Sequence, residues 1–168
     1  MTLDTKFHVE LIADAASPFD LTSAISRLSF VRQINMATGT AANQADKVWS
    51  DERTLTASSS EDLDLSGVLV DPFGATLTLA RVKLLIVYAL PANTNNVVLG
   101  NATSNGWVGP FGAAAHTISI RPGGLISMIA PDATAWPVTA GTGDLLHVAN
   151  SGAGTSVTYD IAVIGSSA

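Results

Sequence analysis

Short apolar runs separated by turn residues make up most of this chain. Runs such as LLIVYAL, TISI, LISMIA and DLLHVAN are each followed by Gly, Pro, Asn or Thr, with turns at a spacing of about ten residues. This spacing is typical of a β-sandwich, and no amphipathic helical pattern of the kind that βαβ units require follows Gly39. The pattern predicts an all-β fold, a single-domain antiparallel β-sandwich over residues 1–168 with jelly-roll topology.

The first 38 residues are harder to assign. KFHVELI (residues 6–12) alternates and predicts a strand, whereas residues 14–20 and 37–46 are predicted loops. LSFVRQINM alternates as well and favours a strand over residues 28–36. A helix stays open there, since apolar residues recur at near-helical spacing at Leu21, Ile25, Leu28, Val31 and Ile34. Residues 1–38 are therefore expected to form an N-terminal arm or edge strands.

Two features in the middle of the chain strengthen the β prediction. DPFG (residues 71–74) has the composition of a tight turn, with Pro fixing one φ angle and Gly closing the turn. The following ATLTLARVKLLIVYAL first alternates and then becomes continuously apolar, as a strand buried on both faces does. The sequence therefore predicts a central strand that starts shortly after Gly74.

Charge is scarce and unevenly distributed. Charged residues make up 13% of the chain and the net charge is -6, while the eight Lys and Arg are scattered, which argues against a nucleic-acid partner. Residues 1–80 carry eleven acids and five bases, and residues 81–168 carry three of each. Burying ions at an interface is costly, so a charge-poor surface favours coverage by other protein subunits. The second half is thus the expected contact region.

Composition also limits the chemistry and the location. With no cysteine in the chain, disulfides, thiolate metal sites and a cysteine nucleophile are excluded. The longest apolar run falls far short of the ~20 residues that span a bilayer, and MTLDTKFHVEL lacks the pattern of a secretory signal. We expect a soluble protein made in the cytoplasm, with no membrane partner.

Candidate catalytic and metal-binding groups are weak. His8, His116 and His147 are far apart in sequence, and the chain has no GxSxG elbow. The acids of the EDLD segment (residues 61–64) leave a calcium site open, although alternation on a strand favours a solvated face. Paired carboxylates leave a hydrolase open. GTGD (residues 141–144) predicts a turn entering a strand. The sequence predicts no enzyme, no cofactor and no metal.

Aromatic residues beside Gly- and Pro-rich loops are the best candidates for recognition. Exposed tryptophans on a β-sandwich stack on sugar rings, which keeps a carbohydrate-binding module for host attachment open. Anchoring of loops or of subunit interfaces is favoured over sugar binding. The candidate interface residues are Phe73, Trp107, Phe111 and Trp136.

Four segments carry a resemblance: ADKVWSDERTL, EDLDLSGVLVDPFGATLTLARVK, NTNNVVLGNA and AGTGDLLHVANSGAGTSVTYDIAVIG. From about Gly39 to its end, the chain resembles a family of small structural proteins of tailed bacteriophages. The resemblance implies a virion component without enzymatic activity, cofactor or catalytic residues. The expected role is a capsid decoration protein, a homotrimer that binds the major capsid protein or other virion subunits. A tail or head-fibre protein is the structural alternative.

Overall fold

The structure is a computed structural model that describes residues 2–168 of the chain. Those residues form an all-β protein in which 14 strands can be followed. The strands are β1 (Thr5–Pro18), β2 (Ser23–Thr38), β3 (Gln44–Ala45), β4 (Lys47–Leu55), β5 (Ser60–Asp64), β6 (Ser66–Val70), β7 (Thr76–Thr78), β8 (Arg81–Ala89), β9 (Val97–Gly100), β10 (Thr117–Ile120), β11 (Leu125–Ile129), β12 (Trp136–Pro137), β13 (Leu145–Asn150) and β14 (Val157–Ser166).

Two antiparallel sheets pack face to face as a β-sandwich. One sheet has the strand order β11-β8-β14-β4, with β12 also paired to β8, and the other has the order β10-β9-β13-β5. A small hairpin of β6 and β7 lies beside them. The predicted antiparallel β-sandwich is therefore confirmed.

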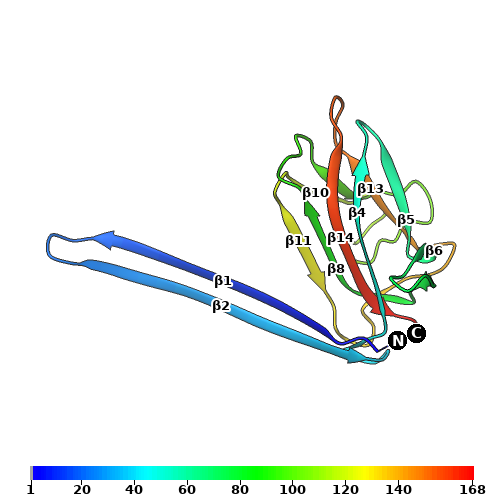
Figure 1. Ribbon diagram of the computed structural model, residues 1–168, viewed down its shortest axis with the longest axis horizontal. Coiled ribbons are helices and arrows are strands. Elements are labelled where there is room, and N and C mark those ends of the chain that lie inside the picture. The colour runs from blue at the N-terminus through cyan, green and yellow to red at the C-terminus, as the bar shows by residue number, and fades with distance from the viewer. Residues whose placement is uncertain (1) are drawn as a thin grey trace.

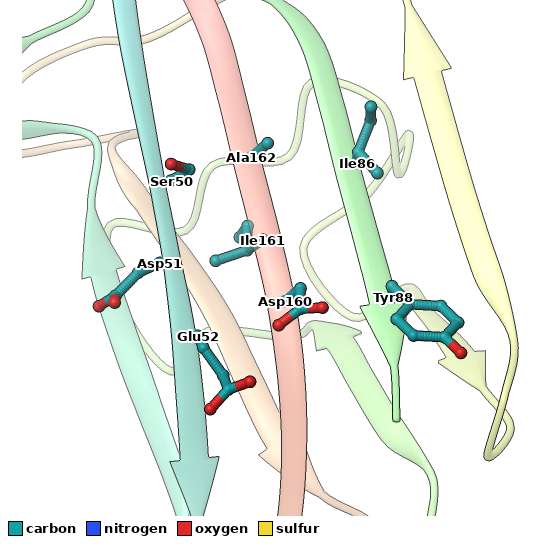
Figure 2. A pocket seen from close by; sticks show the side chains of 8 residues that line it. All are labelled: Ser50, Asp51, Glu52, Ile86, Tyr88, Asp160, Ile161 and Ala162. Atoms are coloured by element: carbon teal, nitrogen blue, oxygen red, sulfur yellow. The ribbon is translucent and has the colours of Figure 1, made fainter. Parts of the chain in front are cut away.

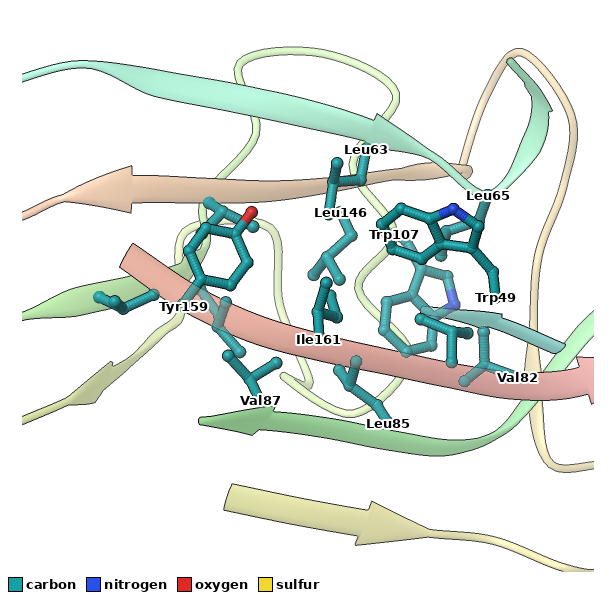
Figure 3. Close-up of a cluster of buried hydrophobic side chains, with 14 of the residues drawn as sticks. Trp49, Leu63, Leu65, Val82, Leu85, Val87, Trp107, Leu146, Tyr159 and Ile161 are labelled. Carbon is teal, nitrogen blue, oxygen red and sulfur yellow. The ribbon is translucent and has the colours of Figure 1, made fainter. Parts of the chain in front are cut away.

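The core lies between the two sheets and follows from alternation along their strands. Leu85 and Val87 of β8, Tyr159 and Ile161 of β14, and Leu146 of β13 are all buried there (Figure 3). On the other face of β8, Leu84 is buried against the root of the arm, whereas Ile86 and Tyr88 are only partly buried. The predicted burial on both faces therefore holds for part of the strand. Burial of these side chains provides the main stabilisation of the sandwich.

The β1–β2 hairpin projects from the sandwich as a long arm (Figure 1). The two strands pair without interruption from Thr5–Met36 at the root to Pro18–Ser23 at the tip, where the Phe19 amide donates to the Thr22 carbonyl at 2.7 Å. At the root, the end of β2 pairs in parallel with β3 and so connects the arm to the body. The arm and the sandwich are therefore two structurally distinct regions of one chain.

The arm settles the open assignments near the N-terminus. The strand predicted over residues 28–36 is confirmed and is longer than expected, since β2 covers Ser23–Thr38. The helix that the spacing of apolar residues left open does not form. The predicted loop at residues 14–20 is wrong over most of its length, since β1 continues to Pro18. Ladder pairing with β2 and the Asp14–Arg27 ion pair hold this segment extended despite its weak β-propensity. The DPFG turn is present, with Gly74 at a φ of 85°.

Candidate functional site

The arm is amphipathic, because paired residues of an antiparallel ladder point to the same side. One side, which we call the apolar face, carries a series of large hydrophobic side chains with Arg32 among them. The opposite side, the polar face, carries most of the arm's charges. The apolar face includes Phe7, Val9, Leu11, Ala13, Leu28, Phe30, Ile34 and Met36. The polar face includes Lys6, His8, Glu10, Ile12, Asp14, Ile25, Arg27, Val31 and Gln33.

Exposed hydrophobic side chains concentrate on this arm. Of the 14 large hydrophobic residues that are exposed among residues 2–168, nine lie at positions 9–31. Leu11 on the apolar face is 50% exposed and Ile12 on the polar face is 54% exposed. A two-stranded hairpin on its own is marginally stable in water, and a large exposed apolar patch marks an interaction surface. The arm is therefore the strongest candidate interaction surface of the chain.

Polar contacts along the arm are superficial. Arg27 donates from Nε and a terminal nitrogen to the two Asp14 carboxylate oxygens, at 2.7 and 2.8 Å. This pairing lowers the pKa of Asp14 and raises the pKa of Arg27. Arg32 lies over the Phe30 ring, 4.6 Å from its centre. Because exposed ion pairs add little stability, these contacts align the two strands without replacing a hydrophobic core.

The root of the arm is well packed on the sandwich. Met36 is fully buried in a small cluster with Leu84 and Ala45, and Phe7, Ile86 and Ile164 pack around them. These contacts cover one end of the outer face of the β11-β8-β14-β4 sheet. The apolar face of the arm thus begins on the subunit's own sandwich and continues beyond it.

A buried lysine of the sandwich contacts the loop at the root of the arm. Lys83 of β8 is fully buried, and its ammonium donates to the Ala41 carbonyl at 2.5 Å. Burial lowers the pKa of Lys83. On the other side of the root, the Thr38 hydroxyl contacts the backbone of Leu3 at 2.7 Å. Both contacts fix the loop that joins the arm to the body and so set the direction in which the arm projects.

The aromatic residues selected from sequence fall into two groups. Trp107 is 3% exposed and lies among the buried side chains of the core (Figure 3). Its indole donates to the Pro137 carbonyl at 3.0 Å, and its ring packs edge-on against Phe111 and Trp136. Phe111 is buried and Trp136 is partly buried. Trp107 and Phe111 therefore anchor loops to the subunit's own core and offer no open surface. The sequence alone does not distinguish aromatic residues that anchor a loop internally from those that anchor an interface.

Phe73 has the opposite environment. It sits in the turn between β6 and β7, is 76% exposed, and lines a shallow hollow with Lys47, Asp71 and Ala75. This small patch remains available to a partner. As an interface residue, Phe73 stays a prediction.

The tryptophans do not provide the exposed shelf that sugar stacking requires. Trp49 and Trp107 are buried in the sandwich core and Trp136 is half-buried. None of the three tryptophans is therefore fully exposed, and an aromatic shelf for sugar stacking stays a prediction.

The acidic cluster near residue 61 is used in structural contacts. Glu61 accepts hydrogen bonds from the Tyr159 hydroxyl at 2.8 Å and from Arg53 Nε at 3.1 Å, closing one edge of the sandwich. Burial and the bond to Glu61 raise the pKa of Tyr159, and Glu61 raises that of Arg53. Asp62 meets His147 across the strand pair at 2.6 Å. No set of three or more His, Asp or Glu side chains within residues 2–168 is gathered closely enough to hold a metal ion.

A shallow hollow on the outer face of the β11-β8-β14-β4 sheet contains a second group of carboxylates (Figure 2). Glu52 and Asp160 are direct cross-strand neighbours, and Tyr88 is the neighbour of Asp160 on the next strand. The hollow is broad and open, with Ile86 and Ala162 forming an apolar part of its floor. Such a surface suits contact with an extended chain better than enclosure of a small substrate.

Comparison with protein-family models, curated proteins and solved structures gives no match to this chain. None of residues 2–168 forms a helix of the length and apolarity that a bilayer crossing needs. Assignment of function therefore depends on the arm, the hollow and the sequence resemblance.

Sequence reasoning located the arm but did not identify it as the principal surface. The sequence of residues 5–36 does contain a signal of the hairpin. When the segment is folded at its tip, residues whose numbers sum to 41 pair with one another, and apolar residues mostly face apolar residues. Leu11 then meets Phe30, and Asp14 meets Arg27. Mirror symmetry of apolar and opposite-charge positions around a short turn predicts a long hairpin with one apolar side.

Proposed function

We propose that this protein is a structural subunit of a tailed-bacteriophage virion, acting as a capsid decoration protein that self-associates and stabilises the capsid lattice. The observation that carries the assembly role is the arm, a projecting hairpin whose apolar face extends past the body of the subunit. A surface of this kind is favoured in a protein that functions inside an assembly. The virion context comes from the resemblance of residues 39–168 to phage structural proteins.

The sandwich supports the same proposal. Successive long strands alternate between the two sheets, with the exception of β9 and β10, which are paired in one sheet. We interpret the two orders, β11-β8-β14-β4 and β10-β9-β13-β5, as a jelly roll. Jelly rolls are common in viral capsid proteins, although fold alone does not define function. Binding to the assembled lattice stabilises it, because a ligand of the assembled state shifts the equilibrium away from disassembly. A homotrimer is the oligomer we expect.

The proposal is tested on purified particles of the phage that encodes the chain. Mass spectrometry is expected to find the protein in many copies per particle. Particles lacking it are expected to release their DNA at a lower temperature, and purified protein is expected to restore the original temperature. Absence of the protein from purified particles would overturn the virion role. Presence without any effect on the release temperature would overturn the stabilising role.

A further inference from the structure

The outer face of the β11-β8-β14-β4 sheet already binds the apolar face of an arm, namely its own. At the root, Met36 and Phe7 pack on the part of this sheet formed by Leu84 and Ile164. Two residues further along β8 and β14, the same side of the sheet shows Ile86 and Ala162, which are partly exposed in the hollow. The intramolecular contact thus reaches as far as Ile86, which also lines a second hollow together with Phe7 and Val9 of the arm. Beyond Ile86, the surface formed by Ala162, Asp160 and Glu52 is partly or fully exposed.

Beyond Ile86, the arm does not cover this face of the sheet in its own subunit. Figure 1 shows β1 and β2 leaving the sandwich beyond the root and extending away from it. Beyond His8, the remaining ten residues of β1 span about 33 Å at the rise of an extended strand. This length matches the nine-residue β8, so the outer part of an arm is long enough to cross the sandwich of a second copy.

Charges on the two surfaces are complementary. Within residues 5–36, the apolar face carries one charged side chain, Arg32, placed opposite Val9. The hollow carries Glu52 and Asp160 side by side, and neither forms an ion pair with another group of residues 2–168. Adjacent like charges are unfavourable, and a guanidinium placed between two carboxylates relieves the repulsion. Arg32 on the arm is a cation of this kind, carried on an otherwise apolar face.

We propose that the apolar face of the arm binds the outer face of the β11-β8-β14-β4 sheet in a second copy of the chain, with Arg32 beside Glu52 and Asp160. In this contact, the outer part of the arm packs on a neighbouring subunit in the way that Met36 and Phe7 pack on their own sandwich at the root. It rests on the proposed function in specifying how the subunit self-associates. Each copy has one arm and one surface that accepts an arm, namely the hollow with its surroundings, which we call the seat. The contact therefore generates either a reciprocal dimer or a closed ring.

The first test compares two adjacent residues on opposite faces of the arm. Leu11→Asp places a carboxylate on the apolar face, and Ile12→Asp places one on the polar face at nearly the same exposure. Light scattering coupled to size-exclusion chromatography is expected to give an oligomer for the wild type and Ile12→Asp, and a single subunit for Leu11→Asp. Thermal unfolding followed by tryptophan fluorescence, which reports on the sandwich core, is expected to be the same for the two variants.

The proposal is overturned if the wild type is a single subunit at all concentrations, or if the two variants assemble equally. These outcomes leave the virion role standing, because the composition and stability of phage particles are measured independently. Conversely, absence from particles leaves the association measurement valid. Failure of the proposed function and failure of the arm contact are therefore distinguishable.

The second test addresses the seat by charge reversal. Arg32→Glu, and the pair Glu52→Lys with Asp160→Lys, are each expected to weaken association about tenfold or more through like-charge contacts. Combining all three substitutions in one chain restores opposite charges and is expected to recover most of the lost affinity. If the affinity of the triple variant is no higher than that of Arg32→Glu or of the Glu52→Lys, Asp160→Lys variant, the hollow is not the seat and the proposal is wrong.

Discussion

The arm and the sandwich have the same secondary structure and similar alternation, yet their hydrophobic faces have different fates. In the sandwich, Leu85 and Ile161 point to a second sheet supplied by the same chain and are buried. In the arm, Leu11 and Phe30 lie on the part that projects beyond the sandwich, and both remain exposed. The arm is thus an apolar layer that its own subunit leaves largely uncovered. In the proposed assembly, the sandwich of a second copy supplies the other layer.

Truncation of matched leucines is the sharpest way to break this comparison. Leu85→Ala removes a fully buried side chain and is expected to lower the free energy of unfolding of the sandwich by about 2–5 kcal/mol. Leu11→Ala, in the arm, is expected to leave that free energy nearly unchanged. Urea denaturation followed by tryptophan fluorescence at low protein concentration measures both. Equal losses in the two variants contradict the separation into two regions.

The ion pairs of the two regions provide a smaller contrast. The Arg53–Glu61 pair is partly buried and shares the Tyr159 hydroxyl, whereas the Asp14–Arg27 pair on the arm is exposed. Glu61→Gln is expected to cost about 1–2 kcal/mol of sandwich stability, because partly buried hydrogen bonds to a charged group are lost. Asp14→Asn is expected to cause no measurable loss. Urea denaturation measures the loss of unfolding free energy in both variants. An equal loss would contradict the expected difference between the partly buried and the exposed ion pair.

The smallest effect concerns Tyr159 and alkaline pH. Burial and the bond to Glu61 raise the pKa of Tyr159 in the folded state above its unfolded value of 10.0. Above pH 10 the folded state therefore retains a proton that the unfolded state loses, so the stabilising contribution is full below pH 10 and declines as the pH rises beyond it. Tyr159→Phe is expected to cost about 1 kcal/mol at neutral pH and to flatten this decline. An identical alkaline slope in wild type and variant would show that Tyr159 is not its source.

Alternation was sufficient to predict the sandwich but not the assignment of its surfaces. The apolar run predicts β8 as a central strand and DPFG as a turn, because local patterns directly reflect those features, although the outer face of β8 is only partly buried. Whether a side chain is covered by its own chain depends on contacts distant in sequence, so local patterns do not reveal that Trp107 packs in the subunit's own core. The charge-poor second half was expected to carry the contact surface, yet its large exposed hydrophobic residues within the described structure are Val108 and Leu125. Small polar loop residues keep the rest of that surface hydrated without formal charge.

Amide hydrogen exchange of the full-length protein, measured above and below the concentration at which it associates, is the most direct test that assembly completes the arm. Protection of an amide requires a hydrogen bond that rarely opens, so it reports where the fold is finished. The amides of β8 and β14 are expected to exchange slowly at both concentrations, and those of residues 9–31 to become protected in the associated state alone. Equal exchange in residues 9–31 at both concentrations would contradict the account.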